Sequence, residues 1–186
     1  WVWTDWCHLT NGANYIIARQ LVYEIKKRCF NLPVPPNGPF DAPLDSYFQD
    51  YAKKSKVLVD GKATDSGLHI LKGYPGQEVL DVSSEQQGKQ PGVVLDMGSV
   101  APVSRLRIVW ADEKAVPGDW RIDFSEDGKD WKTWLTQSKT RTDPYDQWPG
   151  LEYYAASESP ARYVRYEPVG GDKGKPIRLR QISLFR

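Results

Sequence analysis

The amino-acid sequence predicts a mainly β protein, with a β-sandwich domain over residues 56–186 and a helical, proline-rich appendage over residues 1–55. From residue 56 onward, about nine short apolar runs are separated by turn residues, with no long helical pattern between them. Within this region, residues 119–134 show the pattern of a β-hairpin, in which two alternating runs flank Asp127-Gly128. Helical periodicity is confined to the appendage.

The appendage opens with an aromatic arm, residues 1–6, which is too short to form a core of its own. Its tryptophans, Trp1, Trp3 and Trp6, are therefore expected to dock on something. The sandwich of the same chain, a neighbouring subunit and a membrane interface all remain open, because tryptophan has one apolar and one polar end. The chain begins at Trp1 rather than at Met, so we expect either a removed leader or a fragment.

A helix is expected over residues 13–28, capped by Thr10 or Asn11. Ile17, Leu21 and Ile25 recur at the i, i+4 spacing of one helical face, and three basic residues in the last turn complement the helix dipole. Two further segments follow, an extended connector with five prolines over residues 31–43 and a short second helix over residues 44–51.

Two cysteines, Cys7 and Cys29, are the only ones in the chain and lie 22 positions apart. Their spacing matches no zinc or haem motif, so a disulfide between them is predicted, with two buried thiols as the alternative. A disulfide indicates an oxidising compartment, and we therefore expect a periplasmic or extracellular location.

The predicted strands are short runs that begin in the order of the chain. They read KVLVDG, GLHILKG, GVVLDMG, VSRLRIVWA, WRIDFS, WKTWLT, LEYYAA, RYVRYEP and IRLRQISLF. In the hairpin, an apolar face formed by Trp120, Ile122 and Phe124 alternates with a solvated face formed by Arg121, Asp123 and Ser125. After the turn, Trp131 and Leu135 are expected to return to the apolar face, while Lys132 and Trp134 point away. Trp110, Trp120 and Trp131 are assigned to the core.

The charge balance is close to neutral, with 25 basic and 24 acidic residues, and gives no field that favours nucleic acid or an anionic membrane. No run of about 18 apolar residues is present, so no transmembrane span is predicted. Residues 161–186 hold seven basic residues, which we interpret as the solvated faces of two strands, with a patch for an acidic partner as the alternative.

Residues for catalysis are scarce. His8 and His69 are the only histidines, and no nucleophile-elbow, zinc-protease or phosphate-loop motif occurs. Carboxylates are numerous, but no pair stands out as the acid and base of a glycoside hydrolase. The sequence therefore predicts a protein that is not an enzyme.

A turn-rich aromatic segment, residues 143–154, is the best candidate for binding. Its aromatic residues are Tyr145, Trp148, Tyr153 and Tyr154, and the outward-facing Trp134 joins them. Aromatic planes stack on sugar rings and anchor protein interfaces because they offer a large apolar area at little entropic cost. Asp143, Asp146 and Gln147 could supply orienting hydrogen bonds. The alternative is that Trp148 and Tyr153 fold back over the sandwich edge as a lid.

Four segments follow one another in an order that is typical of one known family. They are Pro91–Gly98 with the strand Val103–Trp110 after it, the hairpin Asp119–Trp131, the ARYVR segment Ala161–Arg165 and the last strand Ile177–Phe185. In these segments, residues 56–186 resemble the discoidin family, also called the coagulation factor V/VIII type C domain. The resemblance implies an eight-stranded antiparallel jelly-roll sandwich of the galactose-binding-like type, in which loops at one end bind glycans, phospholipid head groups or proteins.

The chain also departs from this family. Both cysteines precede the sandwich, whereas many members join the two ends of the domain by a disulfide. Gln181 stands where the family usually has Glu. Residues 81–90 lack the motif of the calcium-supporting loop, although Asp81 and Glu85 could supply oxygens to a structural calcium ion. No other cofactor or metal is expected.

Two function classes remain. The appendage favours an accessory subunit that docks through its tryptophan-rich arm and the sandwich loops into a larger periplasmic or membrane-associated protein complex. The aromatic segment favours the alternative, a carbohydrate-binding module that recognises a glycan through residues 143–154. A glycan-active enzyme is a third and weaker reading. The subunit hypothesis is preferred narrowly, because a free-standing sugar-binding module rarely needs 55 residues of appendage.

Overall fold

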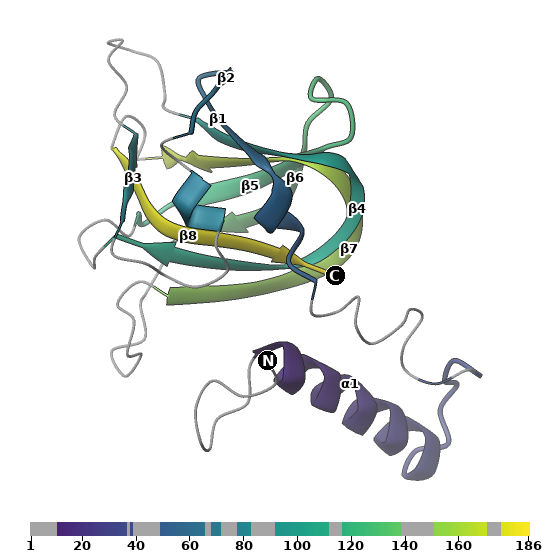
Figure 1. Ribbon diagram of the computed structural model, residues 1–186. Coiled ribbons are helices and arrows are strands. Elements are labelled where there is room, and N and C mark those ends of the chain that lie inside the picture. Colours follow the sequence, from purple (N-terminus) through teal and green to yellow (C-terminus); the bar gives the residue numbers. More distant parts are fainter. Residues whose placement is uncertain are drawn as a thin grey trace. The chain divides into compact units, whose positions relative to one another are not determined.

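Figure 1 shows the computed structural model of the chain. The structure describes residues 11–36, 38, 49–65, 68–71, 78–82, 92–111, 117–138, 151–170 and 176–186. The chain divides into two compact units, Trp1–Gln49 and Asp50–Arg186, and each unit is described by itself. In the described residues, no helix is long and apolar enough to cross a membrane.

The first unit contains the predicted helix, α1, which runs from Asn11 to Arg28 with its basic residues in the last turn. Asn31 follows in the left-handed region with a φ of 49°, a conformation that asparagine tolerates and that ends helices. The Leu32 N–H then donates to the Lys26 carbonyl at 2.9 Å. This bond turns the proline-rich connector back toward α1. The second predicted helix, residues 44–51, lies mostly outside the described residues.

The predicted disulfide stays a prediction. Cys29, directly after α1, is an exposed free thiol in the structure. Cys7 lies outside the described residues, so the pairing itself is not tested.

The second unit is the predicted antiparallel β-sandwich (Figure 1). Its strands are β1 (Lys56–Val59), β2 (Lys62–Ala63), β3 (Leu80–Val82), β4 (Val93–Trp110), β5 (Trp120–Ser125), β6 (Lys132–Gln137), β7 (Leu151–Pro168) and β8 (Ile177–Phe185), with two 3-10 turns, η2 (Tyr51–Lys54) and η3 (Leu68–Leu71). The strands pair in the order β2-β1-β4-β7-β5-β6, and β8 pairs with both β3 and β4.

Two long bent strands, β4 and β7, join the two halves of the sandwich. The first part of β4 pairs with β1 and its second part pairs with β8, while β7 follows β4 along both parts. The ladder between β4 and β7 breaks between Asp96 and Ala101 and again between Val103 and Arg105. These irregularities bend the strands, and Figure 1 shows both curving around one side of the barrel-like unit. The sequence predicts each of them as two separate strands.

One hydrophobic core fills the sandwich. Trp110 and Trp120 are the largest of its fully buried side chains, as predicted, together with Tyr166. The inward-facing residues of β8, including Leu179, Ile182 and Leu184, complete it from the last strand of the chain.

The β5–β6 hairpin is confirmed, but its turn is longer than predicted. Residues 126–131 separate the two strands, and of the Asp127-Gly128 pair only Gly128 has a positive φ, of 77°. The Asp127 carboxylate instead accepts the N–H groups of Lys129 and Asp130 at 2.8 and 2.9 Å. The two-residue turn typical of Asp-Gly occurs at Asp60-Gly61, between β1 and β2, where φ is 50° and 78°.

The predicted facing of β6 is wrong because of a β-bulge. Ile122 pairs with Leu135 and Asp123 pairs with Thr133, so Trp134 is an extra residue in the ladder. Trp134 and Leu135 therefore both pack against the core. Trp131, assigned to the core, is only half-buried and lies instead under the Arg165 guanidinium, 4.3 Å from its carbon.

Three short elements also differ from the sequence prediction. The GLHILKG run contains η3, a 3-10 turn rather than a strand, and its Ile70 and Leu71 are buried in the core. The strands β2 and β3 have two and three residues, too few to show an alternating pattern.

The sandwich unit begins at Asp50 rather than at the predicted residue 56, since Asp50 ties η2 to the last strand. Its carboxylate accepts the Ala52 N–H at 3.0 Å, which caps η2, and the Leu184 N–H of β8 at 3.1 Å. Burial raises the pKa of Asp50 above 3.8, although both bonds act in the opposite direction. The contact satisfies a donor on β8 beyond the last residue that pairs with β3.

Candidate functional site

Six strand termini meet at one end of the sandwich, which we call the loop end. Trp120 at the start of β5 pairs with Gln137 at the end of β6 and with Pro168 at the end of β7. Trp110 at the end of β4 pairs with Leu179 near the start of β8, whose first residue pairs with the end of β3. Segments 83–91, 112–116, 139–150 and 171–175, all outside the described residues, therefore attach at this end.

An aromatic cluster lies beneath the loop end. Trp120 contacts Trp110, Tyr154 and Tyr166, with ring centroids 6.0, 5.0 and 5.9 Å apart, and Trp110 lies 5.4 Å from Tyr166. The Trp110–Trp120 and Trp120–Tyr154 pairs are edge-to-face, a favourable arrangement for aromatic rings. This cluster gives the strand termini a rigid floor.

Polar residues line the described rim of the loop end. Arg178 of β8 pairs with Asp81 of β3 at 3.0 Å, and both side chains are solvent-accessible. Two backbone bonds hold the rim together, from the Ala111 N–H to the Arg178 carbonyl at 3.0 Å and from the Val169 N–H to the Asp119 carbonyl at 2.9 Å. A guanidinium and two carboxylates beside an aromatic floor are the groups that recognise a polar, hydroxyl-rich ligand.

The structure separates the predicted binding residues into three groups. Trp1, Trp3, Trp6, Tyr145 and Trp148 lie outside the described residues, as does the side chain of Tyr153, whose backbone belongs to β7. Tyr154 packs against the core under the loop end.

Trp134 is the third case, and its predicted outward orientation is wrong. Its ring stacks on Phe124 at a centroid distance of 4.6 Å and an interplanar angle of 15°. Its Nε1 donates to the Ser157 carbonyl at 2.9 Å. The ring therefore closes the side of the core, and whether its exposed part meets a ligand stays a prediction.

A charge network covers the outer face of β5 and β7, where the sequence predicts a solvated face. Asp123 is 2% exposed and accepts from Arg165 Nη2 at 2.8 Å and from the Thr133 hydroxyl at 2.8 Å. Arg121 lies 3.0 Å from the same carboxylate and also reaches Glu167 at 2.7 Å. The alternation predicts this face correctly, but not that arginines of two strands bury the aspartate.

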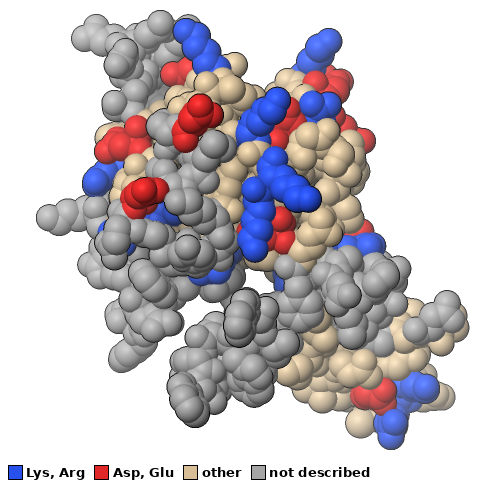
Figure 2. All heavy atoms as spheres, viewed as in Figure 1, with Lys and Arg blue, Asp and Glu red and all other residues tan. Residues whose placement is uncertain are grey.

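The basic residues of 161–186 mostly have acidic partners inside the chain. Four of the five arginines in that stretch pair with a carboxylate, in the pairs Arg162–Asp96, Arg165–Asp123, Arg178–Asp81 and Arg186–Glu158. The Asp96 pKa is lowered chiefly by its hydrogen bonds to Arg162. Figure 2 shows blue and red side chains intermingled over the visible face of the sandwich, an arrangement that favours the solvated-face interpretation.

A metal site is not assembled in the part of the chain that the structure describes, where no three potential ligands gather. Asp81 is paired with Arg178, and Glu85 lies outside the described residues. The calcium ion considered from the sequence stays a prediction.

Comparison with known proteins identifies the domain. Residues 52–181 match the family model of the F5/8 type C domain. No curated protein matches the chain significantly.

Solved structures share the fold at low sequence identity. The module CpGH89CBM32-5 from Clostridium perfringens, solved with GalNAc-β-1,3-galactose, has 12% identity and a TM-score of 0.57 over 74% of this chain and 100% of its own. Chitosan-binding module 2 of a chitosanase/glucanase from Paenibacillus sp. IK-5, solved with chitotriose, has 15% identity and a TM-score of 0.56 over 73% of this chain and 99% of its own. With more than half of its length matched by the family model, the chain belongs to the F5/8 type C, or discoidin, domain family.

Proposed function

We propose that the sandwich is a non-catalytic carbohydrate-binding module that takes a glycan at its loop end. The similar structures include modules solved with an amino-sugar disaccharide, with chitotriose and, in AlyQ, with an unsaturated mannuronic acid. Those ligands belong to those proteins, and at 12 to 15% identity the likeness shows the fold alone. The family and the fold support a binding module more than they support the complex subunit preferred from the sequence.

The observation that carries the proposal is where the aromatic segment attaches. The segment with Tyr145 and Trp148 is bounded by Gln137 of β6 and Leu151 of β7, both at the loop end. It therefore joins the end that carries the Asp81–Arg178 rim and the Trp120 floor. Stacking aromatics and hydrogen-bonding side chains at one place are what a pyranose ring requires.

The test is a glycan array probed with the full chain, followed by affinity measurements on two tryptophan variants. Trp148→Ala is expected to weaken binding of the best glycan about tenfold or more, because a stacking anchor is lost. Trp131→Ala, in the hairpin turn at the opposite end of β5, is the matched control and should bind as the unaltered chain does. An array without saturable binding contradicts the proposal, as does equal binding by both variants.

A second candidate, the accessory subunit, keeps support from one observation in the first unit. Six of the large hydrophobic residues exposed among the described residues belong to α1 or follow it directly, namely Ile17, Leu21, Val22, Ile25, Phe30 and Leu32. Under this hypothesis the full chain captures a fixed partner from its source, and deletion of residues 1–6 abolishes capture. Capture that survives the deletion argues against docking through the tryptophan-rich arm. The periplasmic or extracellular location likewise remains a proposal.

A further inference from the structure

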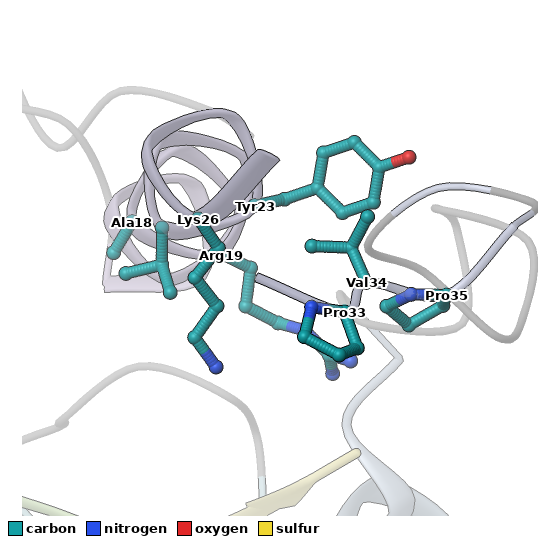
Figure 3. A pocket seen from close by; sticks show the side chains of 8 residues that line it. Ala18, Arg19, Tyr23, Lys26, Pro33, Val34 and Pro35 are labelled. Atoms are coloured by element: carbon teal, nitrogen blue, oxygen red, sulfur yellow. The ribbon is translucent and has the colours of Figure 1, made fainter. Parts of the chain in front are cut away.

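The first unit contains a pocket of about 340 Å³ between one side of α1 and the connector that follows it (Figure 3). Its lining residues are Ala18, Arg19, Val22, Tyr23, Lys26, Pro33, Val34 and Pro35. The pocket lies outside the residues that match the family model and is separate from the loop end of the sandwich. Its volume is at the low end of the range for ligand sites, which favours a small ligand.

The pocket is built by the way in which α1 ends. Asn31 in the left-handed region and the Leu32–Lys26 backbone bond bring the next three residues alongside the helix. Pro33 and Pro35 have their φ angles fixed by their rings, so this wall keeps its shape with little conformational freedom to lose on binding.

The walls combine apolar surface with positive charge. Val22, Val34, the two proline rings and the ring of Tyr23 provide the apolar part. Arg19 and Lys26 are seven residues apart on α1, two turns along one side, and Figure 3 shows both side chains extending beside Pro33.

The acidic residue of α1 is engaged elsewhere. Glu24 is the one carboxylate between residues 11 and 28, against four basic residues. It pairs with Arg28 and accepts from Gln20 Nε2 at 3.2 Å. Residues two or five positions apart do not face each other on a helix, so Glu24 is not placed to neutralise Lys26 or Arg19. The pocket keeps a net positive rim.

We propose that this pocket binds a small apolar carboxylate. The hydrocarbon or aromatic body of the ligand lies against Val22, Tyr23 and Val34, and its carboxylate meets the Lys26 ammonium and the Arg19 guanidinium. Both cations are on the side of α1 that forms the pocket, so an anion bound there gains from two charges, while a neutral molecule of the same shape gains only from the apolar walls.

Octanoate is a suitable probe, titrated into the full chain and followed by calorimetry or by amide chemical shifts. We expect saturable binding with a Kd on the order of 1 mM, because the pocket is open and the ligand is small. Octanamide, its neutral analogue, should bind about fivefold more weakly or less, and raising the salt concentration should weaken octanoate binding selectively. Equal affinities for the two molecules, or no saturation by octanoate, overturn the proposal.

Two matched variants locate the site. Lys26→Met removes the cation at the pocket and should weaken octanoate binding about fivefold, whereas Arg28→Met removes a charge from the same helical turn outside the pocket and should leave binding unchanged. Val34→Asp places a carboxylate in the connector wall and should abolish binding while far-ultraviolet circular dichroism shows α1 intact. Lys26→Met that binds like the unaltered chain contradicts the assignment. A failed glycan array leaves this test unaffected.

Discussion

Asp127 shows how one side chain can hold a turn together. The backbone N–H groups of Asp130 and Lys129, together with the Ser125 hydroxyl, lower the pKa of Asp127 from 3.8 to about 2. A carboxyl group with a depressed pKa in the folded state stabilises that state fully above its ordinary pKa and loses this contribution as the pH falls toward 2.

We therefore predict a pH-dependent effect of Asp127→Asn. The free energy of unfolding of the variant should fall below that of the unaltered chain at about pH 6, and the difference should vanish as the pH approaches about 2. Urea unfolding at several pH values measures it. A difference that stays constant across this range means that the charge of Asp127 does not stabilise the turn.

Trp134 is expected to act as a core residue. Trp134→Ala should lower the free energy of unfolding by about 2 kcal/mol, less than for a fully buried tryptophan because the ring is half-buried. Trp134→Phe, which keeps the stack on Phe124, should cost about half as much. Denaturant unfolding of both variants is the measurement, and an unchanged stability of Trp134→Ala would restore the solvent-facing orientation predicted from the sequence.

At the level of elements, the contact between η2 and β8 depends on an oxygen acceptor at position 50 rather than on charge. Burial raises the pKa of Asp50, so the charge is unfavourable in the folded state, and lowering the pH through that raised pKa removes this cost. Asp50→Asn should therefore leave stability at neutral pH unchanged or slightly increased, because the amide oxygen still accepts both N–H groups. Asp50→Ala should cost about 1–2 kcal/mol by thermal unfolding. Equal losses for both variants would show that the charge is required.

The pairing of β5 with β7 is reinforced by the buried carboxylate of Asp123. Asp123→Ala leaves Arg165 without its closest partner and should cost about 3 kcal/mol. Asp81→Ala breaks the exposed pair with Arg178 and should cost about 0.5 kcal/mol, which makes it the matched control. Denaturant unfolding that ranks the two variants equally would contradict a stabilising role for the network.

The sequence predicts these elements as far as their signals are local. Alternation identifies β5, β6 and β8, and i, i+4 spacing identifies α1, because both patterns come from residues close together in the chain. The bulge at Trp134 depends on the register between β5 and β6, and the continuity of β4 and β7 depends on ladders that resume after an irregularity. Neither follows from a pattern within one strand.

For the whole molecule, the two units predict two separable parts. A fragment of residues 50–186 should fold with nearly the melting temperature of the full chain, because the hydrophobic core lies entirely within it. Calorimetry of the fragment and of the full chain measures this. A large drop in melting temperature would show that the first unit contributes to the core.

The sequence locates the candidate site in the chain but not in space. Its composition points to the aromatic segment around Trp148, which the structure leaves outside the described residues. That this segment attaches beside Asp119 and Arg178 follows from strand pairing over long separations, such as Trp120 with Pro168. The pocket beside Lys26 has no sequence signature, because it arises where the chain reverses after Asn31.

The central claim is that the loop end of the sandwich binds a glycan. The most direct measurement is a titration of the isotopically labelled full chain with the best glycan from the array, followed by amide chemical shifts. We predict saturable changes that gather at Asp119, Val169, Gly170 and Arg178, with the hairpin turn at residues 126–131 unaffected. Changes confined to that turn or to α1, or no saturable change, would contradict the claim.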